Sequence, residues 1–66
     1  MLRFKVSGMT CGHCVSAVTR AVKQVPAVEE VSVDLPRGEV TVRGNPDPAA
    51  VSAAIVEEGY GVQPLA

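Results

Sequence analysis

The two cysteines of the chain lie in one short segment, Cys11-Gly12-His13-Cys14, which leads into a predicted helix. Their spacing, three residues apart across a helix start, lets both sulfurs turn toward one point. Free backbone N–H groups and the helix dipole favour the thiolate form there. Because the thiolate is the form of cysteine that binds metal ions, the segment predicts a metal site formed by Cys11 and Cys14.

The number of sulfurs limits which metal this site suits. The chain has no second cysteine pair, so it cannot complete the four-coordinate site of structural zinc, even with His13 as a third ligand. Soft sulfur ligands select Cu(I), which also accepts a low coordination number. We therefore expect Cu(I), while Ag(I), Hg(II) and weakly held Zn(II) remain chemically possible.

The same two thiols also suit redox chemistry. Cys11 and Cys14 could form a disulfide, or serve a small thiol–disulfide oxidoreductase in which the more exposed Cys11 attacks. The reducing cytosol disfavours a lasting disulfide. His13 is the single histidine of the chain, so no set of nucleophile, base and orienting group can be assembled. We expect a binding protein rather than an enzyme.

The pattern of apolar residues predicts the elements that position the cysteine segment. Alternating apolar and polar residues predict strands, and apolar spacings of three and four predict helices. Pro26 stops the first helix, Asp47 caps the second before Pro48, and Gly59 follows the second as a left-handed residue. The predicted elements are a strand over 2–6, a helix over 13–25, a hairpin with strands at 31–35 and 39–43, a helix over 48–58 and an edge strand over 60–65.

This order of elements, βαββαβ, predicts an α+β fold of the ferredoxin-like kind. In that fold, two helices cover one face of a four-stranded antiparallel sheet. Thirteen residues are valine, and the aromatic residues are Phe4 and Tyr60. The core is therefore expected to be rich in valine and poor in aromatic side chains.

Length and charge exclude several classes of function. Sixty-six residues make one small domain, 1–66, and leave no room for a separate substrate domain. A net charge of −1 carries no electrostatic footprint for nucleic acid or an anionic membrane. No apolar run approaches the ~18–20 residues of a membrane helix, and the N-terminal residues do not resemble a signal peptide. We expect a cytoplasmic chain without membrane insertion.

The segment Gly8-Met9-Thr10-Cys11-Gly12-His13-Cys14 resembles the GMTCxxC metal loop of heavy-metal-associated domains, and of bacterial copper chaperones in particular. The position of the loop between the first strand and the first helix agrees with that family, as does the βαββαβ order. Glu58-Gly59-Tyr60 is also similar to the family's late Gly-Tyr loop. The resemblance covers nearly the whole chain.

The resemblance implies that Cys11 and Cys14 bind Cu(I), that Met9 anchors the loop in the core and that Tyr60 lies near the metal. It further implies delivery of copper, through a shared three-sulfur intermediate, to a copper-transporting P-type ATPase or its soluble metal-binding domain. A metal-binding domain of such an ATPase and a mercury-binding protein are the alternatives within the family. Two chains could also share one copper across facing loops as a homodimer.

Three neighbouring side chains each have two interpretations. Met9 is a thioether ligand or, as we favour, a core side chain. His13 is a third ligand or, as we favour, a group that tunes thiolate basicity and exchange, because it points away from the point shared by the sulfurs. Tyr60 supports the site from behind the ligands or simply caps a small core.

Arg20 and Lys23 lie on the exposed side of the predicted first helix. They steer an acidic partner or form an ordinary solvated helix face.

Overall fold

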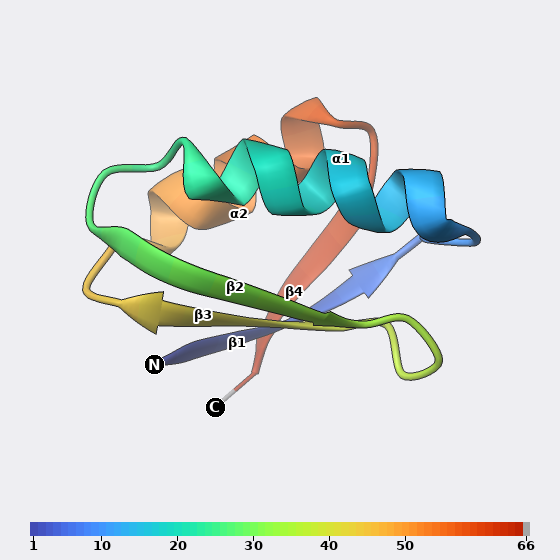
Figure 1. Ribbon diagram of the computed structural model, residues 1–66, viewed down its shortest axis with the longest axis horizontal. Helices are drawn as coiled ribbons and strands as arrows, with labels where there is room; N and C mark the ends of the chain where they lie inside the picture. The colour runs from blue at the N-terminus through green and yellow to red at the C-terminus, as the bar shows by residue number, and fades with distance from the viewer. Residues whose placement is uncertain (66) are drawn as a thin grey trace.

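The structure, a computed structural model, describes residues 1–65 of the chain. Its elements follow one another as β1, α1, β2, β3, α2 and β4 (Figure 1). Their bounds are Leu2–Ser7 for β1, Gly12–Lys23 for α1, Val28–Asp34 for β2, Glu39–Gly44 for β3, Pro48–Glu57 for α2 and Gly61–Leu65 for β4.

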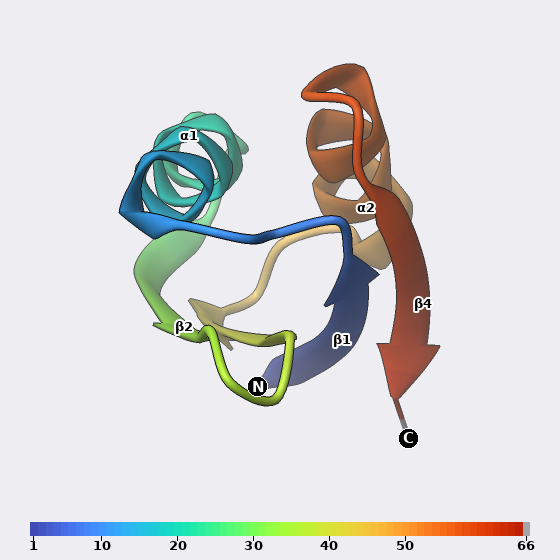
Figure 2. The same cartoon turned by 90° about the vertical axis from the view of Figure 1, so that its right-hand side faces the viewer.

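The four strands form one antiparallel sheet in the order β2-β3-β1-β4. Both helices lie on the same face of this sheet (Figures 1 and 2). This is the ferredoxin-like arrangement, as predicted. β4 is an edge strand, also as predicted, and it holds Pro64 opposite Phe4 of β1. Neither helix in residues 1–65 is long and apolar enough to span a membrane.

The core between the sheet and the helices is built mainly from valine. The side chains buried there are Phe4, Val6, Val18, Val22, Val40, Val42, Val51 and Ile55. Phe4 is the one aromatic member of this set, and Tyr60 only packs against it as a partly buried neighbour. The prediction of a valine-rich core is confirmed.

The first helix ends two residues earlier than predicted. α1 stops at Lys23, and the N–H groups of Gln24 and Val25 donate to carbonyls three residues back, on Ala21 and Val22. A residue before proline avoids helical backbone angles, so Val25 leaves the helix ahead of Pro26. The tightened last turn accommodates this exit.

The strand β2 begins three residues earlier than predicted. Val28 and Val31 lie an odd number of residues apart, yet both pack against the core. A register shift between Val28 and Glu30 explains this, because it leaves Glu29 without a pairing partner on β3. A bulge of this kind breaks the alternation on which the sequence prediction depended.

The ends of α2 follow the predicted signals. The Asp47 carboxylate accepts a hydrogen bond of 3.0 Å from the Ala49 N–H, and Pro48 is the first helical residue. Glu58 is the C-cap residue rather than the last helical one, and Gly59 follows with φ of +94°. Gly59 therefore takes the left-handed conformation expected after a helix.

The antiparallel topology brings three connections to one end of the molecule. They are the β1–α1 loop with both cysteines, the β2–β3 turn and the α2–β4 loop with Tyr60. The Val6 N–H donates to the Gly38 carbonyl of the turn at 2.7 Å, and the Lys5 ammonium donates to the Arg37 carbonyl. The turn thereby supports β1 just before the cysteine loop.

Candidate metal centre

The structure places both cysteines at the start of α1. Cys11 is the N-cap residue in extended conformation, with φ of −156°, and Cys14 lies in the first turn. Cys11 is exposed and Cys14 is half-buried, and both are free thiols. Their Sγ atoms are 3.9 Å apart, so the predicted spacing does bring the two sulfurs together.

This separation suits two sulfurs that share a metal ion. A disulfide would need an S–S distance of about 2.05 Å, and 3.9 Å is well beyond it. Two sulfurs bound to one ion by bonds of about 2.3 Å can lie up to about 4.6 Å apart, so the observed distance is compatible with a shared ion.

The backbone around Cys14 favours its thiolate. Hydrogen bonding from the Thr10 backbone, with a further contribution from the Tyr60 phenol, lowers the pKa of Cys14 from 9.0 to about 6. Desolvation opposes this shift but does not cancel it. Cys14 is thus largely ionised at neutral pH and ready to bind a metal cation.

The sequence predicted a thiolate stabilised by the start of the helix. The strongest donor is instead the backbone of Thr10, which precedes α1. Cys11, as N-cap, accepts no capping hydrogen bond from a backbone N–H of the first turn. The N–H groups of that turn are therefore not occupied by the cap side chain.

Tyr60 lies directly beside Cys14. Hydrogen bonding with the Cys14 sulfur is the main cause of the raised pKa of the Tyr60 phenol, so the phenol stays protonated and can donate. The ring is half-buried, packs against the core and lies over Gly8. A Cβ atom on Gly8 would be 3.3 Å from the ring carbon Cδ1, and Gly8 has φ of +97°. Glycine meets both demands at this position.

Met9 and His13 differ in how far they are buried. Met9 is half-buried and packs against the core, as we favoured from the sequence. His13 is exposed at the start of α1. Within residues 1–65, no group of three or more His, Cys, Asp or Glu side chains could hold a metal ion. Of the side chains that the sequence singled out as possible ligands, the two cysteine sulfurs are the ones that lie together.

Sequence reasoning missed two contributors to the site, Thr10 and Gly8. Thr10 acts through its backbone, so its side chain carries no signal in the sequence. Gly8 could have been found, because a glycine between a strand and a functional loop often marks close approach or a positive φ. The ring that approaches it comes from a residue more than fifty positions away.

Comparison with known proteins supplies the family. The family model of the heavy-metal-associated domain matches residues 3–61. The chain belongs to the heavy-metal-associated domain family. The copper chaperones of this family are not enzymes, in agreement with the prediction from the sequence.

Two curated relatives of this heavy-metal-associated domain represent two kinds of protein. The copper chaperone CopZ of Staphylococcus aureus is 42% identical over 60 residues, which cover 86% of this chain and 88% of the chaperone. Copper-transporting ATPase 1 of Rhizobium meliloti is 44% identical over 62 residues, which cover 91% of this chain but 8% of the ATPase. The chain therefore corresponds to most of a chaperone and to a small part of a transporter.

Solved structures of the family superpose closely on this fold. The N-terminal domain of PacS from Synechocystis PCC6803 has a TM-score of 0.93 at 26% identity and covers 98% of this chain and 96% of its own. A CopZ metallochaperone has a TM-score of 0.89 at 34% identity, with 92% and 96% covered. The N-terminal domain of ZntA in its Zn(II) form has a TM-score of 0.88 at 33% identity, with 96% and 88% covered. Relatives of this chain are thus described with different metals, zinc for ZntA and copper for the CopZ chaperone.

Proposed function

We propose that this domain carries Cu(I) on Cys11 and Cys14 and passes it to a partner by exchange of thiolate ligands. The observation that supports this most strongly is the pair of reduced sulfurs 3.9 Å apart on an exposed loop. Relatives named as a copper chaperone and a copper-transporting ATPase favour copper over other cargo.

The donor set favours a soft monovalent ion. Two thiolates satisfy Cu(I), which accepts low coordination, whereas Zn(II) prefers four ligands. Residues 1–65 offer no cluster of three or more possible ligands. Zn(II) bound here would have to complete its coordination with water or a second molecule, so we expect it to bind far more weakly.

Because Cys11 is exposed, a partner protein can approach the bound ion from the side of this residue. A thiolate of the partner adds to the ion from this side, forming a third copper–sulfur bond. One of the two original bonds then breaks, and its sulfur is released as a thiolate or takes up a proton from solvent. A second exchange completes the transfer without any change in the oxidation state of copper or sulfur.

The surrounding residues prepare the sulfurs for this exchange. Tyr60 and the Thr10 backbone hold Cys14 in its anionic form, and Met9 ties the loop to the core. His13 is exposed beside the pair, where we propose that it tunes exchange rather than binds the ion.

We propose a copper-transporting P-type ATPase, or its soluble metal-binding domain, as the partner. One relative is such an ATPase, and the fold of this chain matches an N-terminal domain of PacS. The chain would act as a single domain in the cytoplasm, where thiols stay reduced and available for metal. The same surface could serve a copper-bridged homodimer when no partner is present.

The deciding experiment is an anaerobic titration of the reduced protein with Cu(I) against a chromophoric chelator, repeated with Zn(II). We expect one Cu(I) per chain to be withheld from the chelator and Zn(II) to be released readily. Transfer is then tested by mixing the loaded protein with an isolated ATPase metal-binding domain, separating the two and measuring copper in each. A chelator that strips all the copper at stoichiometric concentration would overturn the proposal.

A further inference from the structure

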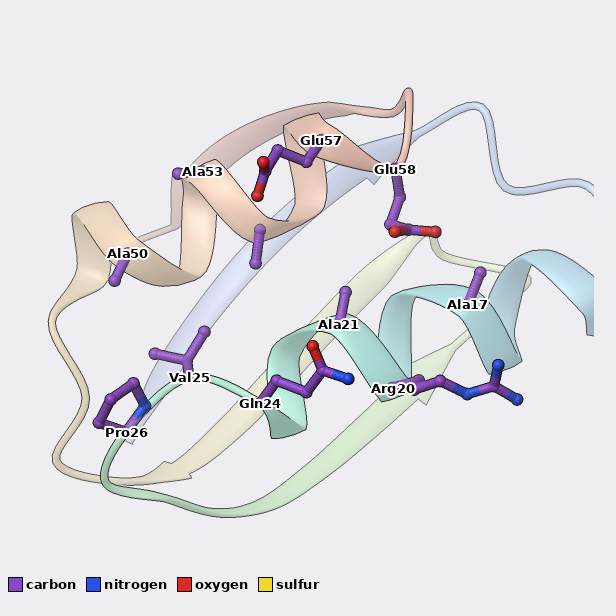
Figure 3. Close-up of a pocket in the computed structure, with 11 residues that line it drawn as sticks. Ala17, Arg20, Ala21, Gln24, Val25, Pro26, Ala50, Ala53, Glu57 and Glu58 are labelled. Carbon is purple, nitrogen blue, oxygen red and sulfur yellow. The ribbon is translucent and has the colours of Figure 1, made fainter.

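A groove runs between the two helices, and its lining on α1 begins at Ala17, one turn beyond Cys14. It has a volume of about 540 Å³, and Figure 3 shows side chains of both helices facing one another across it. Small and apolar side chains form most of its lining: Ala17, Ala21, Val25, Pro26, Ala50 and Ala54. Such a lining lets another helix approach closely.

The helix α2 lacks the polar outer face of an ordinary surface helix. Val51 and Ile55 are buried toward the sheet, yet Ala53 is exposed and Val56 is 55% exposed. A helix that is apolar on several sides usually has protein on more than one of them. Of these two exposed residues, Ala53 belongs to the lining of the groove.

The charged residues of the groove are separated by sign. Arg20 lies on the α1 wall, and Glu57 and Glu58 lie on the α2 wall at the same end (Figure 3). Both glutamates are at the C-terminal end of α2, which has no basic residue in its last turn. Negative charge is unfavourable there. The three ion pairs found in residues 1–65 leave out Arg20 and both glutamates.

We propose that this groove is covered by a second copy of the chain in a two-fold dimer that needs no metal. A two-fold axis parallel to the groove places α1 of one copy on α2 of the other without shifting them along the groove. Arg20 of each copy then faces the Glu57–Glu58 pair of the other, and the apolar linings meet between them. The charge pattern is thus complementary to itself, as a two-fold interface requires.

The size of the helical face sets the strength of this dimer. The face spans the 27 Å and 17 Å dimensions of the molecule (Figures 1 and 2). An interface of that extent lies below the ~1,200 Å² of total buried area that separates standard complexes from weak ones. The dimer therefore forms only at high protein concentration, and it leaves both cysteine loops exposed at one end.

Sedimentation of the reduced, metal-free protein over a concentration series tests the proposal. We expect a reversible monomer–dimer equilibrium that weakens as salt is added. Arg20→Glu, and separately Glu57→Lys with Glu58→Lys, should each weaken dimerisation at least tenfold because like charges then face one another. The triple variant that carries all three reversals should recover most of the wild-type association.

Two control variants distinguish this interface from other causes of dimerisation. Glu30→Lys changes the charge by two units, as Arg20→Glu does in the opposite sense, but on the sheet away from the groove, and should leave the equilibrium within twofold of wild type. The double variant with Cys11→Ser and Cys14→Ser should also dimerise normally, which distinguishes this dimer from a copper-bridged one.

A protein that stays monomeric at all concentrations overturns the proposal. A dimer that ignores the groove reversals, or that requires copper, also overturns it. The copper titration is independent of every one of these outcomes.

Discussion

The Tyr60 phenol and the Cys14 sulfur lie close enough for each to change the acidity of the other. The phenol adds to the effect of the Thr10 backbone in lowering the pKa of Cys14, and the sulfur raises the pKa of Tyr60. The two residues come from connections at opposite ends of the sequence. Fold topology therefore contributes directly to the chemistry of the cysteine loop.

Tyr60→Phe should raise the pKa of Cys14 above its value of about 6, because the ring stays in place while its hydrogen-bond donor is lost. The measurement is the rate of alkylation of Cys14 as a function of pH, in a Cys11→Ser background with and without Tyr60→Phe. The shift should be partial, since the Thr10 backbone is the larger contributor. Identical alkylation profiles for the two proteins would show that the phenol does not act on the sulfur.

The stability of the metal-free protein should increase between pH 6 and pH 9 through Cys14. Its folded pKa of about 6 lies below its ordinary value of 9.0, so folding favours the thiolate. This contribution is complete above pH 9 and is lost as the pH falls through 6. Urea unfolding of wild type and Cys14→Ser at several pH values measures it. A constant difference between the two proteins across this range would contradict the lowered pKa.

Replacement of either cysteine should abolish tight Cu(I) binding. Cys11→Ser and Cys14→Ser each leave one sulfur, and a single thiolate should lose the competition with a chromophoric chelator. His13→Ala is the matched control, because it changes the exposed residue between them. It should keep the affinity and alter only the pH dependence or rate of exchange. Tight binding that survives in Cys11→Ser would exclude a site with two thiolates.

Gly44→Ala should destabilise the fold by about 1–3 kcal/mol. Gly44 has φ of +117°, and an added Cβ would collide with the Ala27 carbonyl and lie 2.9 Å from the Glu29 nitrogen. Gly59→Ala is the control, because its φ is +94° but nothing lies within 4 Å of the added atom. Chemical unfolding should show a larger loss for Gly44→Ala, and equal losses would mean that backbone strain alone matters.

Ile55→Ala should destabilise the domain by roughly 2–5 kcal/mol, because it opens a cavity in a small core. Val56→Ala, one residue further along the same helix, should change stability by at most about 0.5 kcal/mol. Ile55 is fully buried, whereas Val56 is 55% exposed. Thermal unfolding of both variants tests the assignment of the two faces of α2. Similar effects of the two substitutions would contradict this assignment.

The sequence predicts the number, order and type of the elements because its local signals agree with one another. Asp47, Pro48 and Gly59 each act within a few residues of their own position. The helix and strand boundaries that differ from the prediction have physical causes that the periodic pattern of apolar residues does not contain. Val25 leaves the helix because proline follows it, and the bulge at Glu29 depends on pairing with β3.

The candidate site likewise contains features that local sequence predicts and features that depend on residues far apart in the sequence. The convergence of Cys11 and Cys14 follows from their spacing, so it could be predicted. The donation from the Thr10 backbone is local but is not revealed by the residue type, and the packing of Tyr60 on Gly8 depends on how two separate connections meet. No single segment of the sequence contains that information.

The two outer strands of the sheet limit how copies of this protein can associate. Pro64 lies in β4 and cannot donate a backbone hydrogen bond, while β2 carries the unpaired bulge and the exposed acids Glu29 and Glu30. Features of this kind prevent a sheet from extending strand by strand into a neighbouring molecule. A domain that must expose reactive thiols can therefore reach a high local concentration without forming fibrils.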